Sequence, residues 1–280
     1  MRRLLPHELA LGALLVLTGA RLVHAGGPAG PHALRFLLLL AAAAAVPSLP
    51  AWRWRLVACA IVVQGMFYVI RPVVDAIHPQ RVDAYLALAD LRLFGLNPNL
   101  ALERFGSPLL SDALSLFYLL AFLPYLAFAF VSYYRGESKD FRRFCAGLFT
   151  VYALGFLGYT LWPAVGPYAA MAGSFKGPLA GGVFTAAHHA LVVRGTNGID
   201  AFPSLHCALT GFVLAFDRSR APRRFRLMLG PVAALWAATV YLRYHYVVDV
   251  AAGFAVAAVG LWAARQPGLR RASKSRSFCS

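Results

Sequence analysis

Long apolar stretches alternate with short polar segments along most of the 280-residue chain. A helix needs about 20 apolar residues to cross the hydrocarbon core of a bilayer, and several stretches approach that length. They cover approximately residues 7–24, 33–48, 53–74, 109–133, 144–164, 203–217, 227–245 and 248–264. Because the second, sixth and eighth stretches are short, the pattern predicts about six to eight spans. We therefore expect an all-α fold, a polytopic transmembrane helix bundle.

Composition and charge agree with this fold class. Hydrophobic residues make up 60% of the chain and charged residues only 14%, with a mean hydropathy of +0.62, whereas a soluble domain carries roughly 25% charged residues. The formal net charge is +16, and the cations gather between apolar stretches at 135–143, 217–226 and 265–276. Cytoplasmic loops of membrane proteins have this distribution. We expect a bilayer as partner and no nucleic acid.

The basic segments also predict an orientation in a cell or inner membrane. With the N-terminus in the cytoplasm, alternating spans place all three basic segments and the C-terminus on the cytoplasmic side. The segments at about 75–108 and 165–202 then lie outside. The first has acidic residues spaced among apolar ones, which favours one or two amphipathic helices lying in the interface. These acidic residues are Asp75, Asp83, Asp90 and Glu103.

The first apolar stretch has two interpretations. Residues 1–25 have a basic start, an apolar middle and a Val-x-Ala ending, as a cleaved secretory signal peptide does. A retained first helix is the alternative that we prefer. Residue 26 begins outside in both cases, so the orientation of the later spans is the same.

Three predicted spans, at 144–164, 203–217 and 227–245, each have one end on the outer face. These ends carry the sequences GYTLWPAVGPY, PSLH and YLRYHYVVD. They bring two histidines, an aspartate and an arginine to one membrane depth. Ionisable groups at that depth are costly and by default indicate function.

His245 and Asp249 are four residues apart, so on a helix they share a face. A carboxylate that accepts the proton of one imidazole nitrogen fixes the tautomer and leaves the other nitrogen free as a nucleophile. Taken alone, the pair more often has a structural role, in which Asp249 tethers a histidine at a helix turn.

His206 adds what a phosphoryl transfer needs. The leaving oxygen requires an acid, and a second histidine can serve as that acid and then as the base for the incoming hydroxyl. The transferring group also needs donors for its oxygens. Pro203 suits the first turn of a helix, and the amides of Ser204 and Leu205, with the Ser204 hydroxyl, would face an anion at that helix start.

These segments resemble the type-2 phosphatidic acid phosphatase superfamily. PSLH (203–206) is similar to its second signature, usually Pro-Ser-Gly-His, and YLRYHYVVDVAAG (241–253) is similar to its third, in which aspartate and then glycine follow histidine at steps of four. GYTLWPAVGPY (158–168) resembles a segment of the inositol phosphorylceramide synthase branch. The resemblance extends over about 155–253.

The resemblance implies a role for each matching position. His245 would be the nucleophile and would form a phosphohistidine, while Asp249 would orient it. His206 would be the acid and base, and Ser204 would help to hold the phosphate. No metal and no cofactor are implied.

The chain departs from the family pattern in its cations. Thr239 stands where the third signature commonly has arginine, and Arg243 stands two residues before the nucleophile instead. QGMFYVIRP (64–72) has the spacing of the first signature, but it lies too far upstream of His206. We therefore expect the segment around Tyr159 to take the place of the first signature. Besides Ser204, the residues expected to bind substrate or phosphate are Tyr159, Pro163, Gly166, Lys176, Arg194 and Arg243, with Arg71 as a further candidate.

Other polar residues near these ends have less specific interpretations. His188 and His189 could line the outer pocket, although such residues more often are solvated or cap a loop helix. Asp200 could cap the predicted helix at 203–217 or touch the substrate.

Two other kinds of function stay open. A zinc site from His206, His245 and Asp249 is conceivable by ligand count, but no other feature of the sequence favours it. A non-enzymatic transporter or scaffold would more naturally place charges near the midplane on broken helices, often with an inverted repeat. Here the histidines stand at span ends.

The sequence thus predicts an integral membrane enzyme that acts on a lipid-linked phosphoester at the outer face. The expected domains are N-terminal helices with the outer amphipathic segment (1–108), a catalytic core (109–265) and a basic cytoplasmic tail (266–280). With an alcohol as acceptor the reaction would be a transfer such as that of inositol phosphate, which the branch resemblance favours. With water it would be a phosphatase for phosphatidic acid or a prenyl phosphate. The oligomeric state is not indicated.

Overall fold

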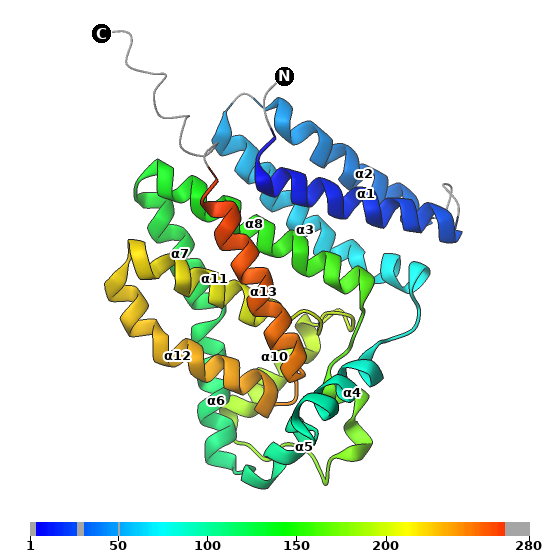
Figure 1. Cartoon of the computed structure of the whole chain (residues 1–280), viewed down its shortest axis with the longest axis vertical. Coiled ribbons are helices and arrows are strands. Elements are labelled where there is room, and N and C mark those ends of the chain that lie inside the picture. The colour runs from blue at the N-terminus through cyan, green and yellow to red at the C-terminus, as the bar shows by residue number, and fades with distance from the viewer. Residues whose placement is uncertain (1–3, 27–30, 50, 267–280) are drawn as a thin grey trace.

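The computed structural model describes residues 4–26, 31–49 and 51–266, which form helices joined by loops (Figure 1). The predicted all-α class is confirmed, because the described residues contain no β-strand and only one isolated bridge, between Ala164 and Asp200. Except for Gln266, the predicted basic tail lies outside the described residues. The α-helices are α1 (Pro6–Gly26), α2 (Pro31–Ala45), α3 (Trp52–Ile77), α4 (Asp83–Phe94), α5 (Pro98–Leu102), α6 (Pro108–Ala121), α7 (Leu123–Arg135), α8 (Ser138–Leu161), α9 (Pro167–Ala170), α10 (Val183–Gly195), α11 (Leu205–Arg220), α12 (Pro222–Tyr241) and α13 (Val247–Ala264). Short 3-10 helices lie at Val46–Ser48, Glu103–Phe105 and Ala172–Ser174.

Within the described residues, five helical segments are long and apolar enough to cross a membrane. They are Pro6–Gly26, Trp52–Ile77, Pro108–Arg135, Ser138–Leu161 and Val247–Ala264, and each matches a predicted span. The other three predicted spans correspond to α2, α11 and α12, of which α2 is a shorter apolar helix and α11 has 16 residues. The bundle therefore combines five long spans with three shorter or more polar helices.

Two predicted spans differ in detail from the observed helices. The span at 109–133 is interrupted at Phe122, where α6 ends and α7 begins. Pro124 accounts for the break, because proline has no N–H to donate and its ring clashes with the carbonyl four residues earlier. The span predicted to continue to residue 245 ends at Tyr241, and Arg243 has a left-handed backbone with φ of 68°.

One end of the bundle gathers arginines and their acidic or aromatic partners. Arg55 of α3 pairs with Glu8 of α1 in a buried salt bridge. The Arg142 guanidinium of α8 lies 5.4 Å from the centre of the Trp52 ring, and Arg220 at the end of α11 lies 3.1 Å from Asp140. The starts of α1, α3 and α8 and the end of α11 therefore lie at the same level, as the predicted alternation of spans requires.

α8 is the central helix and packs against α1, α3, α11 and α13. At the end away from the arginines, two glycines let the PSLH segment fit between α8 and α13. A Cβ on Gly158 would lie 2.1 Å from Cδ of Pro203, and a Cβ on Gly253 would lie 2.5 Å from the carbonyl oxygen of Ser204. The segment therefore fits between two packed helices.

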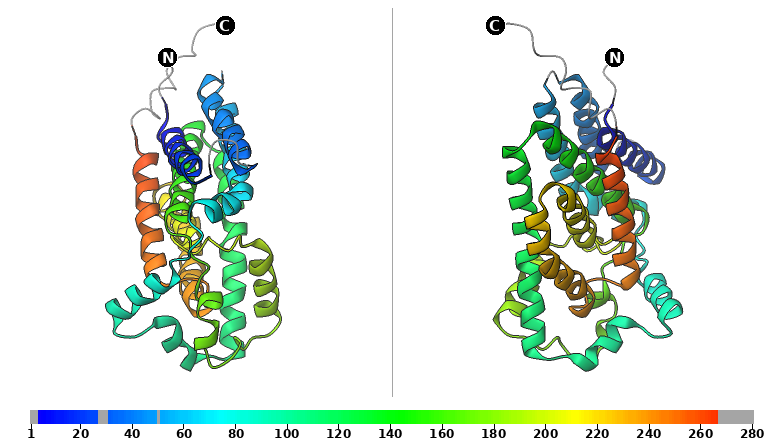
Figure 2. Two further views of the ribbon diagram at one scale, coloured as in Figure 1. Left: turned by 90° about the vertical axis from the view of Figure 1, so that its right-hand side faces the viewer. Right: turned by 60° about the vertical axis from the view of Figure 1, so that its left-hand side comes forward.

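The short helices α4, α5, α9 and α10 gather around that same end (Figures 1 and 2). In the left view of Figure 2, α10 lies alongside α6, with which it is in contact. This layer covers the ends of α8 and α12 and the starts of α11 and α13, where the sequence analysis places its candidate residues.

Candidate active site

The PSLH segment ends as the cap of α11. Ser204 is the N-cap residue, and its hydroxyl accepts a hydrogen bond from the Cys207 amide at 3.4 Å. Pro203, which follows a cis peptide bond, lies before the helix, so its prediction as a first-turn residue is wrong. A hydroxyl at the N-cap satisfies an amide that the helix leaves unpaired, and this interaction fixes the start of α11.

One of the two amides expected to face a phosphate is used within the protein instead. The Ser204 amide donates to the carbonyl oxygen of Asp249 at 3.1 Å. This bond ties the start of α11 to α13, so the Ser204 amide is engaged within the protein. The role of the Leu205 amide toward a phosphate stays a prediction.

His245 lies in the linker between α12 and α13 and not on a helix. Its amide donates to the carbonyl oxygen of Thr239 at 2.9 Å, and its carbonyl accepts from Nδ2 of Asn99 at 3.1 Å. Asp249 belongs to the first turn of α13, where its carboxylate accepts from the Tyr246 amide at 2.9 Å in a capping box. The prediction that His245 and Asp249 share one helix face is therefore wrong, although the fold still brings them together.

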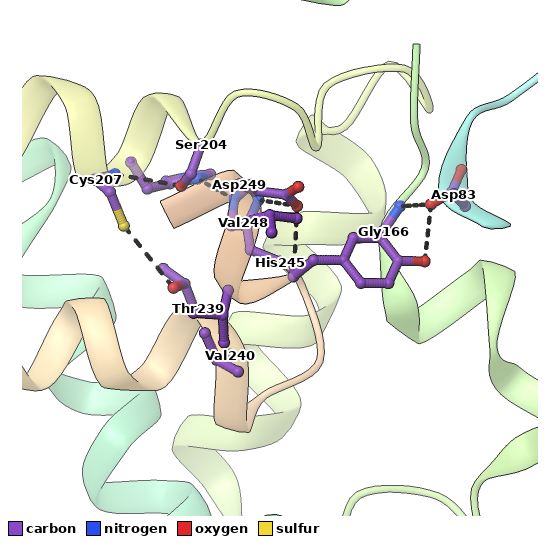
Figure 3. Close-up of polar contacts among 12 residues, drawn as sticks. Asp83, Gly166, Ser204, Cys207, Thr239, Val240, His245, Val248 and Asp249 are labelled. Carbon is purple, nitrogen blue, oxygen red and sulfur yellow. Dashed lines mark hydrogen bonds and ion pairs between the residues drawn. The ribbon is translucent and has the colours of Figure 1, made fainter. Parts of the chain in front are cut away.

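Two histidines and a carboxylate lie in a row, the histidine array, and two of them, His245 and Asp249, are labelled in Figure 3. Nδ1 of His206 lies 3.2 Å from Nε2 of His245, and Nδ1 of His245 lies 3.5 Å from a carboxylate oxygen of Asp249. His245 and Asp249 are buried, whereas His206 is partly exposed. Since His206 and Asp249 face opposite nitrogens of His245, the three cannot converge on one metal ion as placed, which disfavours the zinc interpretation.

Two aspartates of α4 hold the loops around this array. Asp83 accepts hydrogen bonds from the amides of Val165 and Gly166 at 3.0 and 2.8 Å. Asp90 accepts from the amides of Val247 and Val248 at 2.9 and 3.0 Å, at the start of α13. Burial raises the pKa of Asp90, and the two amide donors oppose that rise.

The segment 75–108 forms short helices, among them α4 and α5, and its placement in the interface stays a prediction. Asp83 and Asp90 are buried against the protein. Asp83 and Asp90 are seven residues apart, which places them on one face of α4 two turns apart. That spacing could have identified both as residues facing the protein. Asn99, which fixes His245, had no comparable signal in the sequence.

The segment around Tyr159 is held in place by its own polar contacts. The Pro163 carbonyl accepts from the Val82 amide at 2.9 Å. Gly166 has φ of 95°, and a Cβ there would lie 2.5 Å from the Tyr244 carbonyl oxygen. Tyr159, Pro163 and Gly166 therefore shape the wall of the site. Their expected contact with substrate stays a prediction.

The candidate cations are dispersed. Arg243 donates to the Gly177 carbonyl at 2.8 Å and to Glu103 at 3.2 Å, and its guanidinium lies 3.9 Å from the centre of the Phe175 ring. Lys176, Arg194 and Arg71 are exposed, and Arg71 lies beside Gly198. Asp200 accepts from the Thr196 hydroxyl and does not cap α11, whose cap is Ser204.

His188 is buried, with 2% of its surface exposed, so the commoner interpretation as a solvated or capping residue is wrong for this histidine. Its ring centre lies 4.1 Å from that of Tyr118 and 5.0 Å from that of Tyr244. Tyr118 in turn lies 5.0 Å from His206, and Phe122 lies 4.4 Å from it. Burial lowers the pKa of His188 to about 4, so this histidine is neutral at physiological pH. His189 is exposed.

A groove of about 390 Å³ lies at the same end of the bundle. It is lined by His78, Val82, Tyr85, Leu86, Leu161, Trp162 and Phe202. None of His206, His245 and Asp249 lines it, so the groove is separate from the histidine array.

Comparison with known proteins identifies the family. The model of the PAP2 superfamily matches residues 85–263, which include every member of the array. The chain belongs to the PAP2 superfamily. The predicted resemblance is thereby confirmed, and the five helical segments long and apolar enough to cross a membrane agree with an integral membrane protein of this family.

Similarity to one curated protein agrees with the predicted branch of the PAP2 superfamily. The chain is 29% identical over 167 residues to a protein of Bacteroides thetaiotaomicron named phosphoinositol dihydroceramide synthase. The aligned part is 55% of this chain and 54% of the relative, so the chain spans about half the length of that protein. No solved structure matches the chain.

Asp90 offers a test of how the site is positioned. Asp90→Ala removes the acceptor of two amides at the start of α13, so we expect Asp249 and His245 to shift and kcat to fall about 10²-fold, the cost typical of a small misplacement. Asp90→Asn keeps one acceptor oxygen and should recover part of the loss. Turnover is measured in detergent beside Glu137→Ala, an exposed carboxylate at the opposite end. Unchanged kcat in Asp90→Ala would show that the array does not depend on α4.

Proposed function

We propose that this enzyme moves a phosphorylated headgroup from a membrane phospholipid, phosphatidylinositol, to a ceramide-like or diacylglycerol-like alcohol through a phosphohistidine at His245. The observation that supports this most is the pairing of Nδ1 of His206 with Nε2 of His245 at 3.2 Å, with a buried carboxylate behind. The similarity to a protein named phosphoinositol dihydroceramide synthase supports inositol phosphate as the transferred headgroup and a ceramide-like alcohol as the acceptor.

In the first half of the reaction, Nε2 of His245 attacks the phosphorus of the donor. The bond between phosphorus and the glycerol oxygen breaks, and His206 gives that oxygen a proton, so that diacylglycerol leaves. Asp249, facing Nδ1 of His245, stabilises the positive charge that the ring gains. For the phosphorus to enter, the two rings must separate from their 3.2 Å contact.

In the second half, His206 takes the proton of the acceptor hydroxyl. The acceptor oxygen attacks phosphorus and the bond to His245 breaks, which restores both histidines. The proton that His206 lost to the first alcohol is thus replaced by the proton of the second, and the headgroup ends on a new lipid.

The charges near the array favour a phosphodiester donor over a phosphate monoester. A monoester carries about −1.5 to −2 charges at neutral pH, whereas a diester carries one. In the part of the chain that the structure describes, no arginine or lysine hydrogen-bonds to His206, His245 or Asp249, and Arg243 is paired with Glu103. A site with few cations suits the smaller charge.

The catalytic unit that we propose reaches beyond the predicted core of 109–265. It includes α4 and α5, because Asp83, Asp90 and Asn99 hold the loops of the site. We also propose that this end faces the outside, because the arginine-rich end opposite it has the charge of a cytoplasmic face.

The test uses the purified protein in detergent with phosphatidylinositol labelled at phosphorus, a ceramide and a chelator. We expect the label to appear in a new phospholipid that keeps the inositol, in proportion to the ceramide added. Phosphatidic acid is supplied in a parallel reaction. Rapid release of inorganic phosphate from phosphatidic acid, with no transfer from phosphatidylinositol, would overturn the proposal in favour of a lipid phosphate phosphatase.

A further inference from the structure

His188 is a buried histidine whose two ring nitrogens have no hydrogen-bond partner. The hydroxyl of Tyr118, whose ring lies against it, is also buried and unpaired. Buried polar groups in native proteins are nearly always satisfied, so an unpaired cluster calls for a specific explanation. A ligand that supplies the missing donors and acceptors is such an explanation.

The cluster lies one aromatic ring away from the histidine array. The Tyr118 ring centre is 4.1 Å from that of His188 and 5.0 Å from that of His206. Tyr244, next to His245 in the linker, closes the other side at 5.0 Å from His188. A group attached to a phosphorus between the two catalytic histidines would therefore lie within reach of His188.

The position of His188 is fixed by polar contacts between α10 and α6. Asp112 of α6 accepts from the amides of Gly182 and Thr185 at 2.8 and 2.9 Å and from the Thr185 hydroxyl at 2.7 Å. Ser115 donates to the Thr185 hydroxyl at 3.4 Å. His188 follows Thr185 by three residues and Tyr118 follows Ser115 by three, so each lies on the docked face one turn further on.

The chemistry of the cluster identifies what it would bind. A neutral imidazole offers one donor and one acceptor, and a tyrosine hydroxyl offers both as well. An alcohol hydroxyl also donates and accepts, so two neighbouring hydroxyls can satisfy both nitrogens, whereas the free oxygens of a phosphodiester accept only. The flanking rings of Tyr118 and Tyr244 offer apolar faces to the carbon framework of a ring.

We propose that His188, with Tyr118 and Tyr244, forms a subsite for the hydroxylated ring of the donor headgroup, and that His188 determines the preference for a cyclic polyol over a headgroup without hydroxyls. This inference rests on the proposed function, in which the headgroup stays on phosphorus during transfer. His188 holds one or two ring hydroxyls while His245 attacks. Asp112 and Thr185 act as positioning residues for it.

The test compares two phosphodiester donors, phosphatidylinositol and phosphatidylmethanol, which differ in the hydroxylated ring. His188→Phe keeps an aromatic ring and removes both nitrogens. We expect it to lower the ratio of kcat/KM for phosphatidylinositol to that for phosphatidylmethanol at least about 10-fold, since the hydroxyls lose their partners. His188→Gln, whose amide has an NH₂ donor group and a carbonyl acceptor, should restore part of the ratio. The matched control is His189→Phe on the exposed neighbour.

A second readout does not need turnover. In the His245→Ala background, stabilisation of the protein against heating by phosphatidylinositol in nanodiscs should exceed that by phosphatidylmethanol, and His188→Phe should remove the difference. Equal losses with both donors, or an unchanged ratio, would overturn the subsite. If the wild-type protein transfers neither headgroup but binds phosphatidylinositol through His188, the proposed function fails while the subsite stands.

Discussion

His245→Ala is expected to reduce headgroup transfer on the order of 10⁴-fold or more, the scale of loss when a covalent nucleophile is removed. The reason is that no other group of the array can take its place. Nε2 of His245 faces His206 at 3.2 Å, and Asp249 lies behind the opposite nitrogen. Without the imidazole the reaction cannot divide into two displacements.

Detection of the intermediate makes this prediction specific. With phosphatidylinositol labelled at phosphorus and no acceptor, the wild-type protein should carry label that survives alkali and is lost in acid, as a phosphohistidine does. His245→Ala should carry none, whereas His189→Ala, which changes an exposed histidine, should behave as wild type. His245→Gln tests whether any loss is one of folding, because glutamine keeps a polar side chain of similar length at this position. Label or turnover that survives both variants would exclude His245 as nucleophile.

The helices and the family were predictable from the sequence because their signals are local. The length of an apolar stretch identifies a helix that can cross a bilayer. The bounds of α1, α3, α8 and α13 lie close to those of the predicted stretches. PSLH and HYVVD are short signatures that contain the residues proposed to react. The sequence analysis thus found His206, His245 and Asp249 together, and the structure brings them into contact in one array.

The supporting residues were not predictable in the same way, because they act across the fold. Asp90 holds the start of α13 from 157 residues away in the sequence, and Asn99 holds His245 from 146 residues away. His188 is buried on a helix, α10, that Asp112 docks on α6. A charged or polar residue in an outer segment is usually solvated, so its pattern in the sequence does not reveal a distant partner.

The direction of the predicted phosphate cation Arg243 depends on the fold. The end of α12 and the left-handed backbone at Arg243 direct its guanidinium to Glu103 and the Gly177 carbonyl, and a role in phosphate binding stays a prediction. Proximity in sequence fixes a side chain's direction only within a regular helix or strand. The linker between α12 and α13 is neither, so the direction of Arg243 depended on the tertiary structure.

His206→Ala is expected to lower transfer from phosphatidylinositol about 10²- to 10⁴-fold, the range for loss of a general acid and base. The glycerol oxygen is a poor leaving group and needs a proton as its bond to phosphorus breaks. His206 is placed to give it, because its ring faces Nε2 of His245 and is backed by Tyr118 and Phe122. His245 itself is untouched, so the nucleophile remains.

A donor with a better leaving group therefore distinguishes the proposed acid role of His206 from the nucleophile role of His245. With a nitrophenyl ester of inositol phosphate as donor, nitrophenol leaves without a proton, so His206→Ala should release one equivalent per protein almost as fast as wild type. The second displacement still needs a base, so phosphorylated His245 should accumulate and turnover should stall. His245→Ala should give no release with this donor. An equal loss for both donors in His206→Ala, with no accumulated phosphoprotein, would assign His206 a role in binding or folding and remove it from the proton transfers.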